Sequence, residues 1–204
     1  MAVSIHPVLV RGVFGTYCYF VVDDASGHGV LVDAGAQADL LARTAADAGW
    51  TIDAILLTHG HFDHFGAAKV LSRLWDAPIW AHRESPTYLE SPLLNLSGNY
   101  GPGITLHQVS AFDDGHAFPI AGSGLELVAI HVPGHTRDSV AFHCPDLGVA
   151  FVGDTVYEGG PGLTVFPTGD PQTLARSIAR LKAAVPPDTL LLSGHSQPIE
   201  ASQL

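Results

Sequence analysis

One seven-residue stretch in the first third of the chain restricts the fold more than any other. Residues 58–64 read Thr-His-Gly-His-Phe-Asp-His and directly follow an Ile-Leu-Leu run, which indicates a buried strand. His59 and His61 are two positions apart, so on extended backbone both imidazoles project to the same side and can reach one ion. Asp63 and His64 follow at the expected start of a helix, where the chain turns. The spacing therefore predicts two neighbouring metal sites supplied by one loop.

Length and composition indicate a single globular unit. The chain has 204 residues, enough for one hydrophobic core, and no stretch has the composition of a linker, so we expect one domain over residues 1–204. Charged residues make up 14% of the chain, against about 25% in an average protein. A surface with so little charge is compatible with an interface between two copies, and we expect a homodimer.

The charge balance and hydropathy exclude several classes of partner. The formal net charge is −11 and the nine Lys and Arg residues are scattered, which leaves no basic patch for nucleic acid. No apolar run approaches the roughly 20 residues needed to span a bilayer. The first residues also lack the basic and apolar regions of a signal peptide. We therefore expect a cytoplasmic protein without nucleic-acid or membrane partners.

Periodicity in the rest of the chain predicts alternating strands and helices in layers. Apolar and β-branched runs mark strands, and apolar residues at helical spacing mark helices. The expected strands are 5–13, 16–23, 29–33, 51–57, 78–81, 125–131, 139–143, 149–152 and 189–192, and the expected helices are 37–48, 65–75 and 171–184. In helix 65–75 the apolar positions expected to face the sheet are Ala68, Val70, Leu71 and Leu74.

Residues 83–116 differ from the rest, because Ser, Pro, Gly and Asn are dense and periodicity is weak. Loops of this length inside a compact domain are usually functional or disordered. We interpret this segment as a lid or a wall of the active site, with Tyr88, Asn95, Asn99 and Tyr100 as its candidate contact residues.

Three further candidate ligands share one kind of position. His135, Asp154 and His195 each follow a glycine at the end of an expected strand, as His61 does. A lone histidine at any of these positions would more often be structural. Loops at one edge of a layered sheet structure, however, are where ligands from distant parts of a chain meet. The shared position therefore predicts that these residues complete the site.

The order of these motifs identifies a family resemblance. THGHFDH followed by PGHT, GDT and a late SGH resembles the metallo-β-lactamase superfamily. The resemblance implies an α/β fold, a four-layer αββα sandwich of two mixed β-sheets flanked by helices. It also implies a first metal held by His59, His61 and His135, a second held by Asp63, His64 and His195, and Asp154 bridging the two.

Within that superfamily the chain looks like the compact, single-domain glyoxalase II branch, whose enzymes hydrolyse hydroxyacylglutathione. The strings DDGH, PGHTRDSVAF and GDTVYEGGPGLTVFPTGD carry this resemblance. Two features depart from the branch: the chain stops soon after His195, and Leu163 stands about where an Arg is expected. The resemblance therefore implies a thioester or related ester as substrate, of the S-2-hydroxyacylglutathione type, more firmly than it implies glutathione itself.

The ligand types suit two divalent ions, Zn²⁺ first and Fe²⁺ or Mn²⁺ as alternatives. Such a pair lowers the pKa of a bridging water from about 15.7 to about 7, which supplies hydroxide as the nucleophile. We expect Asp63 and Asp154 to be catalytic, the first by orienting the hydroxide and the second by holding the ions together. Behind the ligands, Asp33 and Thr58 are candidates to fix imidazole tautomers. Tyr157 and Tyr100 are candidates to contact the substrate.

Other interpretations remain open. Asp33 is equally well explained as a turn or helix-cap residue. His59, His135 and Asp154 alone would form the mononuclear iron site of a persulfide dioxygenase, and a lactonase or other ester hydrolase differs only in the acyl group. A metal-storing module is disfavoured, because seven convergent ligands exceed what storage requires.

Overall fold

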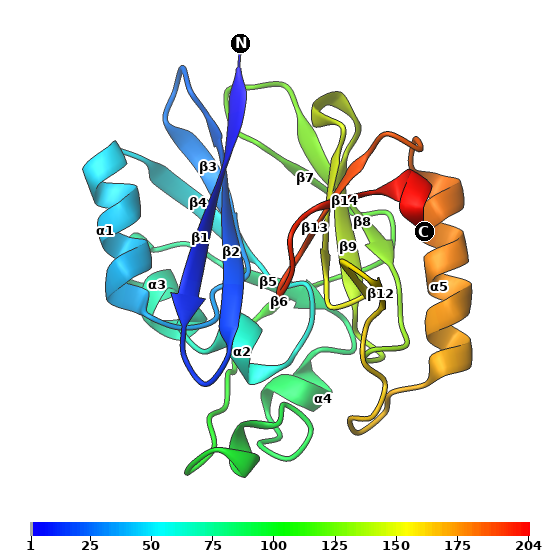
Figure 1. Cartoon of the computed structure of the whole chain (residues 1–204). Helices are drawn as coiled ribbons and strands as arrows, with labels where there is room; N and C mark the ends of the chain where they lie inside the picture. Colours follow the sequence, from blue (N-terminus) through cyan, green and yellow to red (C-terminus); the bar gives the residue numbers. More distant parts are fainter. Residues whose placement is uncertain (1) are drawn as a thin grey trace.

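The computed structural model describes residues 2–204 and shows two six-stranded β-sheets packed face to face, with helices on both outer faces (Figure 1). The expected αββα sandwich is therefore confirmed. The first sheet is antiparallel over its first three strands and parallel over the rest. Its order is β1 (Val3–Arg11), β2 (Gly15–Asp23), β3 (His28–Val32), β4 (Thr51–Leu56), β5 (Ile79–His82) and β6 (Ser110–Phe112).

The second sheet is antiparallel except where β10 pairs with β13. Its order is β14 (Ile199–Glu200), β13 (Leu190–Ser193), β10 (Val149–Gly153), β9 (Val140–Cys144), β8 (Glu126–His131) and β7 (Ala117–Pro119). A small hairpin of β11 (Val156–Tyr157) and β12 (Gly160–Pro161) follows β10. The first half of the chain thus forms one sheet and the second half forms the other.

Helices cover the outer face of each sheet. Helices α1 (Ala38–Ala48) and α3 (Ala68–Trp75) lie on the first sheet, and α5 (Pro171–Ala184) lies on the second (Figure 1). Two single-turn helices, α2 (Phe62–Phe65) and α4 (Pro86–Leu89), interrupt the loops, as do 3₁₀ turns at Ser97–Asn99, Pro145–Leu147 and Ala201–Gln203. Helix α5 begins with Pro171, and the Asp170 carboxylate accepts backbone N–H bonds from Gln172 and Thr173.

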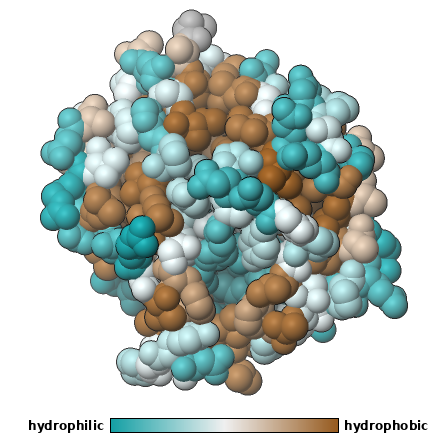
Figure 2. All heavy atoms as spheres, in the orientation of Figure 1, coloured by the Kyte–Doolittle hydropathy of each residue, from teal (hydrophilic) through white to brown (hydrophobic). Residues whose placement is uncertain are grey.

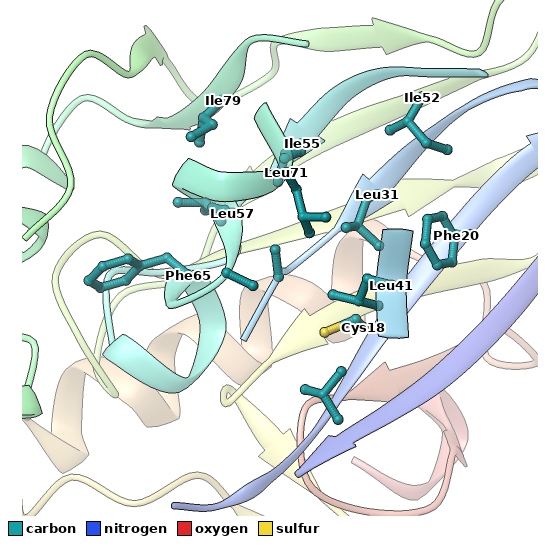
Figure 3. Packing of buried hydrophobic residues seen from close by; sticks show 14 of the residues in the cluster. Cys18, Phe20, Leu31, Leu41, Ile52, Ile55, Leu57, Phe65, Leu71 and Ile79 are labelled. Atoms are coloured by element: carbon teal, nitrogen blue, oxygen red, sulfur yellow. The ribbon is translucent and has the colours of Figure 1, made fainter. Parts of the chain in front are cut away.

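The central strands are apolar on both faces because both faces are covered. In β2, Tyr19 and Val21 point into the core between the sheets, while Cys18 and Phe20 point toward the helices. Figure 3 shows the outer core, where Phe20, Leu31 and Ile55 from the strands meet Leu41 and Leu71 from the helices. This two-sided packing fixes the strand ends that carry the polar loops.

Each predicted helix and strand has a counterpart, but the helix expected over 65–75 begins only at Ala68 and the strand expected over 5–13 spans Val3–Arg11. Val70 and Leu74 do not face the sheet as expected, and are 57% and 62% exposed. The buried stripe of α3 runs through Ala68 and Leu71, and Val70 lies one residue, about 100°, away from it. The expected loop 83–116 contains α4, a 3₁₀ turn and β6.

No helix among residues 2–204 is long and apolar enough to cross a membrane.

Candidate metal centre

Seven histidine and aspartate side chains meet where strands of both sheets end. Strand β4 leads into the loop that carries His59 and His61, and α2 then carries Asp63 and His64. The other three follow β8, β10 and β13 at positions His135, Asp154 and His195. The structure therefore brings together all seven side chains that the sequence predicts as ligands.

These side chains form two adjacent groups. In each group the potential ligand atoms lie within 4.8 Å of one another. One group is His59, His61 and His135, and another is Asp63, His64 and His195, while a third set within the same distance, His59, His64 and Asp154, links the two.

Asp154 lies between the two groups and faces both. Its Oδ2 is 3.6 Å from Nε2 of His135 and 3.3 Å from Nε2 of His195. Its Oδ1 is 3.3 Å from Nε2 of His64, in a geometry that makes no hydrogen bond. A carboxylate so placed can contact an ion in either group, which is the arrangement a bridging ligand requires.

Hydrogen bonds on the far side of the imidazole rings determine which ring nitrogen each histidine turns toward the site. Nδ1 of His135 donates to the carbonyl of Leu163 at 2.6 Å, and Nδ1 of His195 donates to the carbonyl of Gly15 at 2.8 Å. Each ring therefore carries a proton on Nδ1 and turns Nε2 inward. Partners of this kind fix the tautomer and orientation of metal-binding histidines.

Asp33 and Thr58 lie directly behind two further candidate ligands. The Asp33 carboxylate accepts hydrogen bonds from the backbone N–H of Thr58 and from its hydroxyl, both at 2.8 Å, and lies 2.8 Å from Nδ1 of His64. Because the Thr58 hydroxyl donates to Asp33, its lone pairs face Nδ1 of His59 at 3.1 Å. His59 and His64 therefore also present Nε2 to the site.

His61 is the exception, because it presents Nδ1. That atom is 3.1 Å from Nε2 of His59 and 2.9 Å from Nε2 of His135. The opposite nitrogen of His61 is buried without a hydrogen-bond partner. Three imidazole nitrogens thus converge on one small volume in the first group.

Burial and charge give the two groups opposite protonation. Burial lowers the pKa of His59 well below its usual value and that of His61 to about 3. Burial also disfavours charge on His64 and His195, but the Asp154 carboxylate helps to raise the pKa of His64 well above its usual value and that of His195 to about 10. Without metal, the histidines of the first group are neutral, whereas His64 and His195 are protonated beside the carboxylates.

The residues present fit a pair of dications. Nδ1 of His61 lies 2.9–3.1 Å from two other ring nitrogens, and a proton on it would satisfy one of them at a time, whereas a cation among them would satisfy all three. Oδ1 of Asp154 is buried and accepts no hydrogen bond, and buried carboxylates are costly unless paired or coordinating. Imidazole and carboxylate ligands without thiolate suit Zn²⁺, Fe²⁺ or Mn²⁺.

A cavity of about 330 Å³ opens onto this centre. Its floor is polar and its walls are mainly apolar, as ligand pockets usually are. The lining residues are Phe14, Gly15, His61, Asp63, Leu96, Asp154, Tyr157, Leu163, Phe166 and His195. The sequence did not point to Phe14, Leu96 or Phe166, because an apolar residue in a loop carries no chemical signature.

The two tyrosines expected at the substrate differ in position. Tyr157 lines the cavity, and burial together with Asp154 raises the pKa of its hydroxyl, which therefore stays protonated. Tyr100 does not line it, and instead packs edge-on against Phe14, with ring centroids 5.3 Å apart. Tyr100 is therefore connected to this cavity through its contact with Phe14 and does not line it.

Segment 83–116 contributes only Leu96 to the lining of this cavity. Asn95 is buried and donates to the carbonyl of Ile104, while Asn99 is exposed. Tyr88 is also buried, where its hydroxyl accepts a hydrogen bond from the backbone N–H of Arg137. Tyr88 and Asn95 therefore hold loops together and are not part of the cavity wall.

Comparison with known proteins agrees with this arrangement. The Metallo-beta-lactamase superfamily model matches residues 11–195. The hydroxyacylglutathione hydrolase GloC of Haemophilus influenzae is 31% identical over 202 residues, covering 96% of this chain and 91% of that protein. A hydroxyacylglutathione hydrolase of Fuscovulum blasticum is 35% identical over 184 residues, covering 88% of this chain and 62% of that protein.

Two solved structures are similar over nearly their full length. The BLEG-1 B3 metallo-beta-lactamase superposes with a TM-score of 0.90 at 28% identity, covering 98% of this chain and 95% of that one. TTHA1623 in a di-iron-bound form superposes with a TM-score of 0.84 at 29% identity, covering 97% and 95%.

An αββα sandwich with a histidine and aspartate cluster at its edge, most of it buried, defines a class of metal-binding proteins. The chain belongs to the metallo-β-lactamase superfamily and is a metallo-hydrolase of that superfamily.

Proposed function

We propose that the protein hydrolyses thioesters, or closely related esters, at a centre of two divalent ions. The observation that carries this proposal is the position of Asp154 between two complete ligand groups. The hydroxyacylglutathione hydrolases among its relatives support a thioester as the substrate.

The protein residues hold the ions and orient the reactants. His59, His61 and His135 would hold one ion, and Asp63, His64 and His195 the other, with Asp154 bridging. Bound ions of this kind supply hydroxide at neutral pH and polarise a carbonyl.

Side chains around the ions then position the attacking water and the substrate. Thr16 donates a hydrogen bond to Oδ2 of Asp63 at 3.2 Å, which fixes that carboxylate so that it can accept a proton from the attacking water. The protonated hydroxyl of Tyr157 is placed to donate a hydrogen bond to the substrate carbonyl oxygen.

We propose Zn²⁺ as the native metal. Iron is the alternative to measure, because a similar structure is described as di-iron-bound. A mononuclear iron dioxygenase would leave the group of Asp63, His64 and His195 without a purpose, and this complete second group favours the dinuclear hydrolase.

The test combines metal analysis with a substrate panel. Protein purified without an affinity tag is analysed by mass spectrometry for bound metals, then assayed with S-lactoylglutathione, a simple thioester, a lactone and a persulfide. We expect two ions per chain and thioester turnover that chelation abolishes and Zn²⁺ restores. Asp154→Asn should lose at least 100-fold in kcat/KM, whereas the exposed Asp53→Asn should not change it.

Two results would overturn the proposal. One is thioester turnover that is indifferent to chelation and to Asp154→Asn. The other is a single iron per chain with oxygen consumption on the persulfide. A β-lactam is included in the panel because one similar structure is a B3 metallo-beta-lactamase.

A further inference from the structure

The walls of the cavity at the metal centre contain no Lys or Arg. Phe14 and Leu163 rise on its rim and are 41% and 53% exposed, with Leu96 and Phe166 deeper in the wall. Large apolar side chains that are exposed to solvent at the entrance of a site mark a binding surface. Figure 2 shows hydrophobic, brown patches on both sides of a teal hollow in the lower half of the view.

The apolar surface continues beyond this cavity. A second cavity of about 330 Å³ also contains Phe14, together with Val13 and Ile104. A third, of about 140 Å³, adjoins the second through Val13 and Ile104 and includes Tyr100. None of the residues lining these three cavities is Lys or Arg. An apolar group bound at the metal centre can therefore extend along the tip of the β1–β2 hairpin without meeting a positive charge.

The Lys and Arg residues of the chain lie outside these three cavities. Several are neutralised by acidic partners, in the pairs Arg43–Asp39, Arg83–Asp113 and Arg180–Asp114. The formal net charge of −11 adds a long-range field that disfavours anions. An anionic thiol such as glutathione would thus find no partner for its carboxylates in the described cavities.

We propose that the preferred substrates are thioesters whose acyl or thiol part is uncharged and apolar. This inference rests on the proposed thioester hydrolysis and specifies its substrate class. The apolar part lies against Phe14, Leu163 and Phe166, while the scissile carbonyl lies over the floor of His61, Asp63 and Asp154. Hydrolysis adds water across the C–S bond, releasing a carboxylic acid and a thiol.

Two substrate series test the proposal and show which half of the substrate is apolar. One keeps N-acetylcysteamine as the uncharged thiol and lengthens the acyl group from acetyl to octanoyl. The other keeps acetyl and lengthens an alkanethiol. We expect kcat/KM to rise about fourfold per methylene in one series until the cavity is filled. The best uncharged substrate should exceed S-lactoylglutathione at least tenfold.

Three variants separate charge from shape. Leu163→Arg places a cation in the wall and should raise kcat/KM for S-lactoylglutathione relative to the uncharged substrates about tenfold. Leu163→Gln should flatten the chain-length dependence without favouring the anionic thioester. Val165→Arg adds the same charge at a side chain that is 81% exposed and outside the cavity, and should behave as wild type.

Binding of thioethers, which cannot be hydrolysed, gives a second readout. Calorimetry with S-octyl-N-acetylcysteamine and S-octylglutathione should show at least tenfold tighter binding of the uncharged compound, reduced in Leu163→Arg. If no thioester is hydrolysed, the proposed function fails and this binding ratio alone decides the present inference. Preference for S-lactoylglutathione with a flat chain-length series, or equal binding of the two thioethers, would overturn it.

Discussion

Oδ2 of Asp33 lies 2.8 Å from Nδ1 of His64 and at the same time accepts the hydroxyl proton of Thr58. One buried carboxylate therefore orients His64 directly and His59 through Thr58, and these two histidines form a set of potential ligands with Asp154. Asp33 has a φ of 60°, which turns the chain at the end of β3 and directs the carboxylate beneath the site.

The first prediction concerns this contact. Asp33→Asn should weaken metal binding about 10- to 100-fold. Both oxygens of Asp33 accept hydrogen bonds, whereas only one of the two terminal atoms of an amide, its oxygen, can accept. Asn tolerates the left-handed backbone at this position, so the fold should persist. Titration against a competing chelator measures the loss. Asp53→Asn is the matched control, since Asp53 also contacts a histidine, His28, at 2.9 Å but on the surface. Equal metal affinity in the two variants would contradict the prediction.

The second prediction concerns the close approach of backbone to the ligands. A Cβ added at Gly194 would lie 2.6 Å from Cε1 of His64 and 2.8 Å from Oδ1 of Asp154. Gly194→Ala should therefore reduce the bound metal to about one ion per chain, measured by mass spectrometry. Gly101→Ala is the control, because a Cβ there meets nothing within 4 Å. Full metal content in Gly194→Ala would show that the site tolerates the added methyl group.

The third prediction separates two leucines of α3. Leu71 is fully buried, so Leu71→Ala should lower the free energy of unfolding by about 2–5 kcal/mol. Leu74 is 62% exposed, and Leu74→Ala should change it by less than about 0.5 kcal/mol. Urea denaturation of the two variants measures both values. A similar loss in each would mean that Leu74 is covered in solution, as it would be in a homodimer.

The fourth prediction concerns pH. Burial and Coulombic repulsion by His131, whose stacked ring centroid is 4.2 Å away, lower the pKa of His82 to about 4. The unfolded chain therefore binds a proton on His82 between about pH 6.5 and 4 that the folded chain does not, so stability falls as pH falls through this window.

His82→Phe retains a stacking ring but cannot be protonated. Relative to wild type it should gain on the order of 1 kcal/mol at pH 4.5, after discounting for solvent screening, and little at pH 8. Thermal unfolding of the metal-loaded proteins at both values measures the difference. A gain that is equal at pH 4.5 and pH 8 would assign the effect to packing and not to protonation.

The sequence predicts side chains with distinctive chemistry well and their partners less well. His135 and His195 could be proposed as ligands because each follows a glycine at a strand end. The groups that orient them are the carbonyls of Leu163 and Gly15, and backbone atoms leave no trace in residue identity. The sequence was compatible with Asp33 as a turn residue or as a support for the ligands. In the structure it has both roles, because its backbone turns with a φ of 60° and its carboxylate contacts His64.

Apolar residues were harder to place for a related reason. Val70 and Leu74 are apolar, but only the side of α3 that carries Ala68 and Leu71 packs against the sheet. Tyr88 was expected at a cavity wall because its segment lacks periodicity, yet it is among the largest fully buried side chains. Strands of two or three residues, such as β7 and β14, are too short to show any period.

The carbonyl of Gly15 links the beginning of the chain to its end. It accepts from His195, while the N–H of Tyr17 donates to the carbonyl of Gly194, so the β1–β2 hairpin is clamped to the loop that carries the last ligand. The neighbouring Phe14 lines the cavity. The residue at position 14 can therefore be substituted to alter substrate choice. The backbone of the hairpin must stay unchanged, because it orients His195.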